Sequence, residues 1–139
     1  MEPDLIADPT EQQVAEVERG LGEYDLQFLP GRSSVAIKGV LAESDRVVAG
    51  LYGEMFWGKM HIRLLWVHPD RRQRGLGRRM MAWAEQRSRE LGCYSVTVET
   101  MSFQAPGFYA KLGYRQIGLS QGYERNACRH FFEKDLTGE

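Results

Sequence analysis

The residues that most constrain this chain are a run of arginines and glycines between two regular segments, Arg72-Gln73-Arg74-Gly75-Leu76-Gly77. Before the run, residues 61–67 have the apolar character of a strand, and after it residues 76–91 carry apolar side chains at helical spacing. Glycines allow a tight turn and a close backbone approach to a ligand, and the first N–H groups of a helix have no partner within it. The pattern therefore predicts a strand, a loop and a helix start that bind an anion such as phosphate.

Positive charge gathers around this loop, and Pro69 ends the strand before it. The arginines concerned are Arg71, Arg72, Arg74, Arg78 and Arg79. Such a cluster is also compatible with a solvated surface or with a nucleic-acid contact, because arginines bind phosphate without discrimination. Its position at a glycine turn before a helix favours the phosphates of a cofactor. The net charge of −1 argues against a protein whose main ligand is a polyanion.

Three ordered motifs in residues 60–119 resemble those of the GNAT superfamily of N-acetyltransferases. Arg72-x-x-Gly75-x-Gly77 resembles the Q/R-x-x-G-x-G/A loop with which that family binds acetyl-CoA, and residues 65–69 resemble the strand before it. Further along, residues 105–114 resemble the family signature A-x-x-x-Y-x-x-x-G-[FY], with Tyr109 as its tyrosine. Residues 1–59 are compatible with the family but carry no diagnostic motif.

The pattern of apolar residues and turn signals predicts an order of helix, three strands, helix, strand, helix and two strands. The predicted ranges are about 10–20, 35–42, 47–56, 60–67, 76–91, 94–100, 106–112, 114–119 and 128–134, with a further short strand at 4–7. The resemblance implies an α/β fold with a mixed, mainly antiparallel central sheet that is splayed in the middle and flanked by helices on both faces. We expect residues 1–139 to form a single domain.

Strict alternation along residues 60–67 predicts which side chains share a face of the sheet. It places Met60, Ile62, Leu64 and Trp66 on one face, and His61, Arg63, Leu65 and Val67 on the other. A hydrophobic fraction of 42% and a charged fraction of 27% are typical of an ordinary globular domain. The two cysteines, Cys93 and Cys128, have no C-x-x-C spacing, and the N-terminus has no signal-peptide pattern, so we expect a cytoplasmic protein. Neither a metal nor a membrane partner is expected.

The resemblance also implies the cofactor site. The pyrophosphate of acetyl-CoA would contact backbone N–H groups of the glycine loop, and the pantetheine arm would lie along the strand at 65–67 like an added strand. The cofactor-binding residues implied are Leu65, Trp66, Val67, Arg72, Gln73, Arg74, Gly75, Leu76, Gly77, Arg78, Ser102 and Tyr109. Ser102 stands where many relatives carry an asparagine.

Direct acetyl transfer to an amine needs a neutral nucleophile, a donor for the developing oxyanion and an acid for the departing thiolate. A lysine-like amine is neutral in only about one of 2,500 molecules at pH 7, so a base or a desolvated site must help. The resemblance assigns the oxyanion to a strand N–H near Val67 and the acid to Tyr109. His61 is a candidate base because an unperturbed imidazole titrates near neutral pH. Glu54 and Glu99 are rivals for that role, and His130 and Tyr123 could reach an acceptor from the C-terminal segment.

The acceptor itself is not identified by the sequence. Candidates to line its site are Tyr24, Asp25, Phe28, Trp57, Arg63 and Tyr123. Carboxylates such as those of Glu23, Asp25 and Glu54 suit a cationic amine, whereas Arg63 suits an acceptor that carries a carboxylate. The hypothesis is an acetyl-CoA-dependent N-acetyltransferase acting on a primary amine of a small molecule or peptide. The alternative is a non-catalytic acyl-CoA-binding module of the same fold, and a homodimer is compatible with either.

Overall fold

The computed structural model describes residues 1–31 and 34–137, in two compact units, Met1–Ser33 and Ser34–Glu139. The first unit contains helix α1, Glu11–Asp25. Its N-terminus is closed by a capping box, in which the Thr10 hydroxyl accepts from the Gln13 N–H and the Gln13 side chain accepts from the Thr10 N–H. No residue of α1 is buried. The helix runs beyond the predicted end near residue 20, and the short strand predicted at 4–7 is absent.

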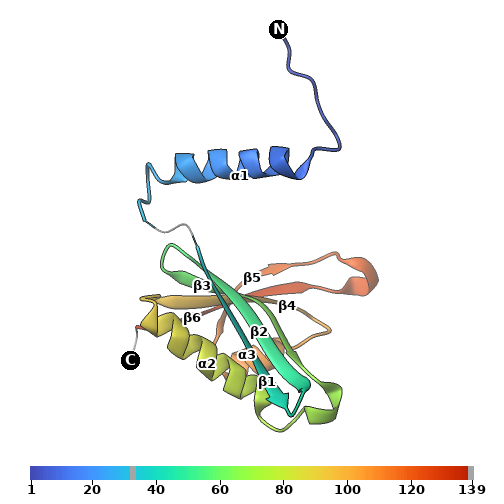
Figure 1. Ribbon diagram of the computed structural model, residues 1–139. Helices are drawn as coiled ribbons and strands as arrows, with labels where there is room; N and C mark the ends of the chain where they lie inside the picture. Colours follow the sequence, from blue (N-terminus) through green and yellow to red (C-terminus); the bar gives the residue numbers. More distant parts are fainter. Residues whose placement is uncertain (32–33, 138–139) are drawn as a thin grey trace. The chain divides into compact units, whose positions relative to one another are not determined.

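In its described residues, the second unit is a six-stranded sheet with two α-helices (Figure 1) and two 3-10 helices, Pro69–Arg71 and Glu124–Asn126. In chain order its strands and α-helices are β1 Val35–Glu43, β2 Arg46–Phe56, β3 Lys59–Val67, α2 Leu76–Glu90, β4 Ser95–Met101, α3 Pro106–Lys111, β5 Arg115–Ser120 and β6 Arg129–Asp135. The strand order is β1-β2-β3-β4-β6-β5, and every pair is antiparallel except β3 with β4. The predicted element order and the mixed, mainly antiparallel α/β fold are confirmed. No helix in the described part of the chain is long and apolar enough to cross a membrane.

One hydrophobic core joins α2 and α3 to the sheet. Met81 and Ala84 of α2 are fully buried with Leu51 of β2, and Tyr109 of α3 belongs to the same cluster. Apolar positions of α2 recur at helical spacing, so one face of this helix packs on the sheet while its arginines face outward. Truncation of a buried leucine or methionine to alanine typically costs about 2–5 kcal/mol of stability, so this core holds the loop and the helices in place.

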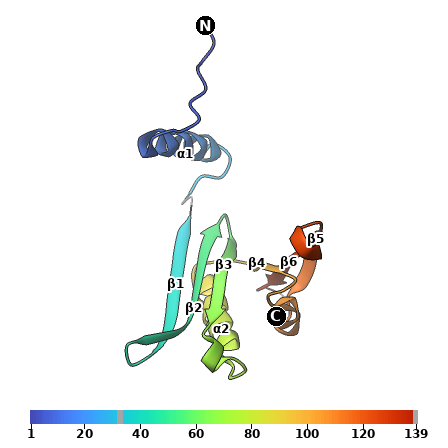
Figure 2. The same cartoon turned by 90° about the vertical axis from the view of Figure 1, so that its right-hand side faces the viewer.

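The sheet divides between β3 and β4. Their parallel pairing extends only from Lys59↔Ser95 to Ile62↔Val98, and beyond it the two strands diverge (Figure 2). We call the point after Ile62 and Val98 the fork. Because β3 continues to Val67 without β4 beside it, the backbone groups of residues 63–67 on that edge are left unpaired with β4. The splay implied by the family resemblance is therefore present.

A β-bulge at Arg63 corrects the predicted faces of β3. Tyr52 pairs with Leu64 and Gly53 pairs with Ile62, so Arg63 is an extra residue in the ladder. One extra residue moves every later side chain to the opposite face of a sheet. Leu64 and Trp66 consequently lie on the face of His61, where they are 47% and 42% exposed, while Leu65 and Val67 pack against the core that contains Met60 and Ile62.

Candidate active site

A cleft of about 1090 Å³ opens where β3 and β4 separate. Its walls come from the free edge of β3, the glycine loop, the start of α2, the end of β4 and helix α3. Among the residues implied by the family resemblance, it is lined by Leu65, Trp66, Val67, Arg72, Gln73, Gly75, Leu76, Gly77, Arg78 and Tyr109. Arg74, Ser102 and His61 do not line it. Most of the residues expected from the sequence thus lie on one surface.

The glycine loop places the start of α2 at this cleft, and no side chain caps the helix there. Gly75 is the N-cap residue with a φ of 80°, and no side chain bonds to the first turn of the helix. Gln73 also has a positive φ, 64°, which is costly for a residue with a Cβ and is typical of ligand-binding turns. The first turn carries Arg78 and Arg79 and no acidic residue, which is unfavourable against the helix dipole unless an anion is bound. The local structure is thus suited to a phosphate group.

Two ion pairs connect the β1–β2 hairpin to the segment before the loop. Arg71 donates to both carboxylate oxygens of Glu43, at 2.9 and 2.7 Å, and Arg46 donates to Asp70 at 3.0 Å. The Arg71 guanidinium holds the pKa of Glu43 below its usual range by hydrogen bonding, and Arg46 lowers the pKa of Asp70 in the same way. Both pairs are exposed to solvent, so their contribution lies in orientation more than in stability.

The remaining arginines of the loop differ in what they contact. Arg72 donates from Nε to the carbonyl of Val67 at 3.1 Å, which fixes the end of β3 against the loop. Arg74, Arg78 and Arg79 make no ion pair with any carboxylate in the described residues. Their charge is therefore free to act on an anion at the start of α2.

Tyr109 places a phenol at the opposite wall of the cleft. Only 6% of the residue is exposed, and its ring packs against Phe108, Tyr114 and Phe132 with centroid distances of 5.0, 5.9 and 6.2 Å. Burial raises the pKa of Tyr109 to about 12, because the phenolate would lose its hydration. The hydroxyl therefore carries its proton at neutral pH.

Helix α3, which carries Tyr109, is short and is held at both ends. At its start the buried Thr100 hydroxyl accepts from the N–H of Ala105 at 3.2 Å. Beyond its end the Tyr114 hydroxyl donates to the buried carboxylate of Glu85 in α2 at 2.8 Å. Lys134 of β6 donates both to Glu85, at 3.1 Å, and to a carbonyl at the C-terminus of α3. Buried charges that are paired in this way fix the helix, and with it the phenol.

His61 and Glu99 meet on the other side of the fork. The Nδ1 atom of His61 lies 2.9 Å from the Thr97 hydroxyl, and its Nε2 atom lies 3.8 Å from Glu99 Oε2. Glu99 lines the cleft, and its Oε1 accepts from Arg129 at 3.1 Å. Glu54 is paired with Arg63 at 3.3 Å. Of the two rival carboxylates, Glu99 therefore reaches the cleft, and His61 lies next to it.

Thr97 and Arg129 were not singled out by the sequence. Their contacts depend on the register of β4 against β3 and β6, which pairs Thr97 with His61 and sets Arg129 opposite Met101. Alternation within each strand indicates which residues share a face, but no local signal in one sequence fixes which residues of two distant strands lie opposite each other. The contacts of these two residues could therefore be identified only from the three-dimensional structure of the sheet.

The other residues considered from the sequence have different roles in the fold. Ser102 forms two bonds with Cys128, donating from its N–H to the carbonyl and accepting at Oγ from the N–H. His130 lies 2.8 Å from the side-chain oxygen of Gln116. Tyr123 lies under the guanidinium of Arg129, 5.5 Å from ring centroid to Cζ. The acceptor candidates Tyr24, Asp25 and Phe28 belong to the first unit.

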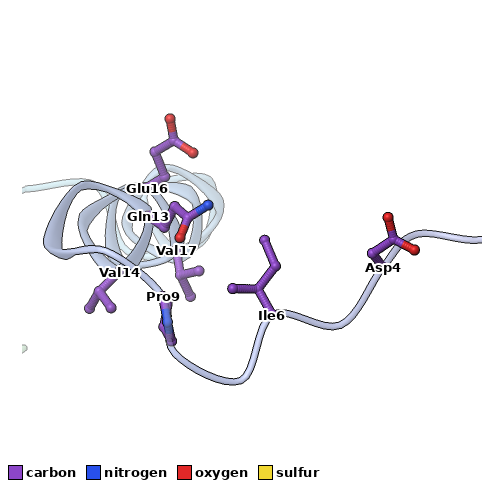
Figure 3. Close-up of a pocket in the computed structure, with 7 residues that line it drawn as sticks. All are labelled: Asp4, Ile6, Pro9, Gln13, Val14, Glu16 and Val17. Atoms are coloured by element: carbon purple, nitrogen blue, oxygen red, sulfur yellow. The ribbon is translucent and has the colours of Figure 1, made fainter.

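A smaller hollow of about 470 Å³ lies within the first unit (Figure 3). It is lined by Asp4, Ile6, Pro9, Gln13, Val14, Glu16 and Val17, all of them exposed except the half-buried Gln13. Figure 3 shows the carboxylates of Asp4 and Glu16 well apart, with apolar side chains between them. Its two carboxylates do not converge, and no cationic side chain lines it that could hold a phosphate, so the cleft at the fork is the candidate site.

Comparison with known proteins identifies the family of this chain. The family model of the acetyltransferase (GNAT) family matches residues 4–114. The chain belongs to the GNAT acetyltransferase family. Members of this family use acetyl-CoA, and the glycine loop, the fork and the tyrosine helix of this chain all lie within the matched region. The match also includes the N-terminal residues that the sequence motifs left uncharacterised.

Individual relatives support the family assignment. The blasticidin-S acetyltransferase of Streptomyces morookaense is 42% identical over 95 residues, which cover 68% of this chain and 70% of that protein. A crystal structure of an acetyltransferase from Bacillus cereus ATCC 14579 is 28% identical with a TM-score of 0.84, covering 95% of this chain and 97% of that one. A protein from Bacillus anthracis str. Ames, solved in complex with acetyl coenzyme A, has the same fold at 16% identity, with a TM-score of 0.64 over 78% of this chain and 66% of that one.

Proposed function

We propose that this GNAT acetyltransferase transfers the acetyl group of acetyl-CoA directly to a primary amine of a small molecule or a peptide. The observation that carries the proposal is the early end of the β3–β4 pairing, which opens one cleft between an uncapped, cationic helix start and a buried, protonated phenol. The first wall suits the diphosphate of the cofactor, and the second suits the sulfur that must leave.

In this proposal the diphosphate binds the free N–H groups at Gly75 to Arg78, where the helix dipole and the unpaired arginines assist. The pantetheine arm then follows residues 63–67, because this edge of β3 lacks a neighbouring strand and can accept an added one. That path ends near the fork, between Tyr109 on one side and Glu99 on the other. The acetyl group would therefore lie at the fork, where groups on both faces of the sheet can reach it.

The transfer then requires three proton or charge movements. The neutral amine nitrogen attacks the thioester carbon as His61, with Glu99 beside it, accepts the proton of the amine. A backbone N–H near Val67 stabilises the oxyanion. When the intermediate collapses, the carbon–sulfur bond breaks, and the thiolate takes the proton of Tyr109. Transfer by Glu99 in place of His61 is the alternative for the first step.

An acceptor screen tests the proposal. Its first member is blasticidin S, since the relative from Streptomyces morookaense is named for that compound, followed by a panel of small amines and peptides. We expect release of free CoA thiol that depends on the amine, together with an acetylated amine seen by mass spectrometry. Binding of acetyl-CoA without transfer to any amine would instead favour the acyl-CoA-binding module.

Two broader expectations remain proposals. We propose that residues 1–139 act as one domain, and the support is that the family model runs from residue 4 to 114 and so includes parts of both compact units. A cytoplasmic location is proposed from the sequence, with the free thiols of Cys93 and Cys128 in its favour.

A further inference from the structure

The carboxylate of Glu99 is shared between two partners at the fork. Its Oε2 faces Nε2 of His61 at 3.8 Å, and its Oε1 accepts a hydrogen bond from Nη1 of Arg129 at 3.1 Å. The guanidinium is the nearer and the permanently charged partner, whereas the imidazole is charged only when protonated. The three groups thus form a line from β3 across β4 to β6, with the acid in the middle.

Arg129 is itself held by the loop that precedes β6. The ring of Tyr123 lies 5.5 Å from its guanidinium carbon, within the range of a cation–π contact. The loop is closed by a bond from the N–H of Tyr123 to the carbonyl of Ala127, and it is fixed to the end of β4 by the bonds between Ser102 and Cys128. Arg125 and Asn126 both adopt positive φ values, 58° and 61°, so the backbone accepts strain to keep this shape.

We propose that Arg129 is a positioning residue that binds the Glu99 carboxylate and thereby keeps its charge from stabilising protonated His61. A carboxylate beside an imidazole favours the imidazolium, which cannot accept a proton from an amine. A guanidinium bonded to the same carboxylate opposes that effect. The inference rests on the proposed function for the role of His61 as the base.

The other charges around His61 are already paired. On β2 its cross-strand neighbour Glu54 is bound by Arg63, 3.3 Å away. On β6 Glu133 is bound by Lys59 of β3 at 2.6 Å and lies 3.7 Å from Arg115 of β5. Among the carboxylates around His61, Glu99 is therefore the one that loses its cationic partner when Arg129 is removed. Because Glu99 and Arg129 are about 40% exposed, solvent and salt weaken the coupling, and we expect a moderate effect.

The test measures the titration of His61 directly. The chain has three histidines, so the ring resonances can be assigned by comparison with His61→Gln. In Arg129→Gln we expect the His61 resonance to change position at a higher pH than in the wild type, and Arg129→Lys should restore most of the difference. Arg115→Gln is the matched control, since it removes an arginine from the same sheet that does not touch Glu99.

Activity provides the second measurement. With an amine found in the acceptor screen, the acidic limb of the kcat/KM profile of Arg129→Gln should move to higher pH by the same amount, while kcat/KM at pH 9 and the Kd for acetyl-CoA stay within about threefold of the wild type. If Arg129 were needed only for folding, its replacement would lower kcat/KM at every pH without shifting the acidic limb of the profile.

The outcomes separate this inference from the proposed function. An unchanged His61 titration in Arg129→Gln, or an equal shift in Arg115→Gln, would overturn the role of Arg129. If the His61 titration shifts in Arg129→Gln but the acidic limb of the kcat/KM profile does not, Arg129 does offset the charge of Glu99, and His61 is not the base. If the wild type transfers acetyl to no amine, the proposed function fails, and the titration still decides whether Arg129 controls His61.

Discussion

The phenol of Tyr109 is the side chain on which the proposed chemistry depends most. It lies in a cage of aromatic rings that removes water from the hydroxyl and keeps the proton in place at neutral pH. The nearby tyrosine, Tyr114, has its hydroxyl bonded to Glu85, so Tyr109 is the phenol that we propose as the proton donor to the departing thiolate. Two predictions concern this residue.

In Tyr109→Phe the ring packing should be kept, and the proton donor is lost. We expect kcat to fall by roughly 10²-fold, the low end for general acid catalysis, while the affinity for acetyl-CoA stays within about threefold. Single-turnover transfer must be measured beside steady-state rates, since slow product release would hide the effect. Unchanged single-turnover transfer from about pH 6 to 9 would remove Tyr109 from the mechanism.

The raised pKa of Tyr109 also predicts a loss of stability in alkali. Above about pH 10 the phenol of the unfolded chain loses its proton, whereas the folded protein keeps the proton until about pH 12. The unfolded state therefore binds fewer protons in this window, and the free energy of unfolding falls as the pH rises. Urea unfolding between pH 9 and 11 measures this slope.

Tyr109→Phe should flatten that slope by up to about 1.4 kcal/mol per pH unit, the largest contribution of one group. Tyr114 contributes in the same sense, because burial, and then the charge of Glu85, raise its pKa as well. Tyr123→Phe is the control, since Tyr123 is 37% exposed and lies outside the core. Equal slopes in wild type and Tyr109→Phe would show that the phenol is not desolvated as described.

Among elements, the glycine loop with the start of α2 has the most specific geometry. At Gly75 the positive φ, rather than space, excludes other residues, since a Cβ at this position would meet no atom within 4 Å. At Gly77 a Cβ would lie 3.2 Å from the Phe108 ring and 3.8 Å from a methyl group of Val67. The first glycine thus sets the turn, and the second keeps the cleft open between α2, α3 and β3.

Replacement of these glycines should weaken cofactor binding by different routes. Gly75→Val strains the turn, and Gly77→Val fills the space next to Phe108, so we expect each to reduce the affinity for acetyl-CoA at least tenfold, about 1.4 kcal/mol. Calorimetric titration of the folded variants measures this. Gly22→Ala in α1 is the control, because a Cβ there meets no atom within 4 Å and its φ is not positive. Wild-type affinity in a folded Gly75→Val, Gly77→Val double variant would refute the assignment.

The predicted and the observed elements agree where the sequence signal is local and differ where it is not. Period, glycines and prolines predicted the strands and α-helices of the second unit within a few residues, because these signals are local, but not its two short 3-10 helices. The bulge at Arg63 was missed, because no local signal in the sequence of β3 marks a residue that is skipped in the pairing with β2. The skipped residue reverses the faces of Leu64 and Trp66. The fork itself followed only from the family resemblance, because strand pairing across the sheet depends on contacts between distant residues. The same limit hid Arg129.

For the molecule as a whole, cofactor binding should be measurable as stability. A ligand that binds the folded state alone raises the free energy of unfolding by about 2.7 kcal/mol when its concentration is 100 times its Kd. Acetyl-CoA should therefore stabilise the wild type against thermal unfolding, and the double glycine variant should gain little at the same concentration. A similar gain in both proteins would mean that the cofactor binds somewhere other than the cleft.

The cleft joins three parts of the second unit that are far apart in the sequence: the edge of β3, the loop before α2 and helix α3. Their joint position rests on the core and on the ionic contacts of Glu85, so the site is a property of the assembled sheet. The central claim is that the acetyl thioester lies at the fork, between the phenol and the pair formed by His61 and Glu99.

A crystal structure of the protein with bound acetyl-CoA tests that claim most directly. We predict the diphosphate at the N–H groups of Gly75 to Arg78, the pantetheine arm along residues 63–67 of β3, and the sulfur within hydrogen-bonding distance of the Tyr109 hydroxyl. A cofactor bound elsewhere, or a thioester at the fork with the Tyr109 hydroxyl directed away from its sulfur, would contradict the account.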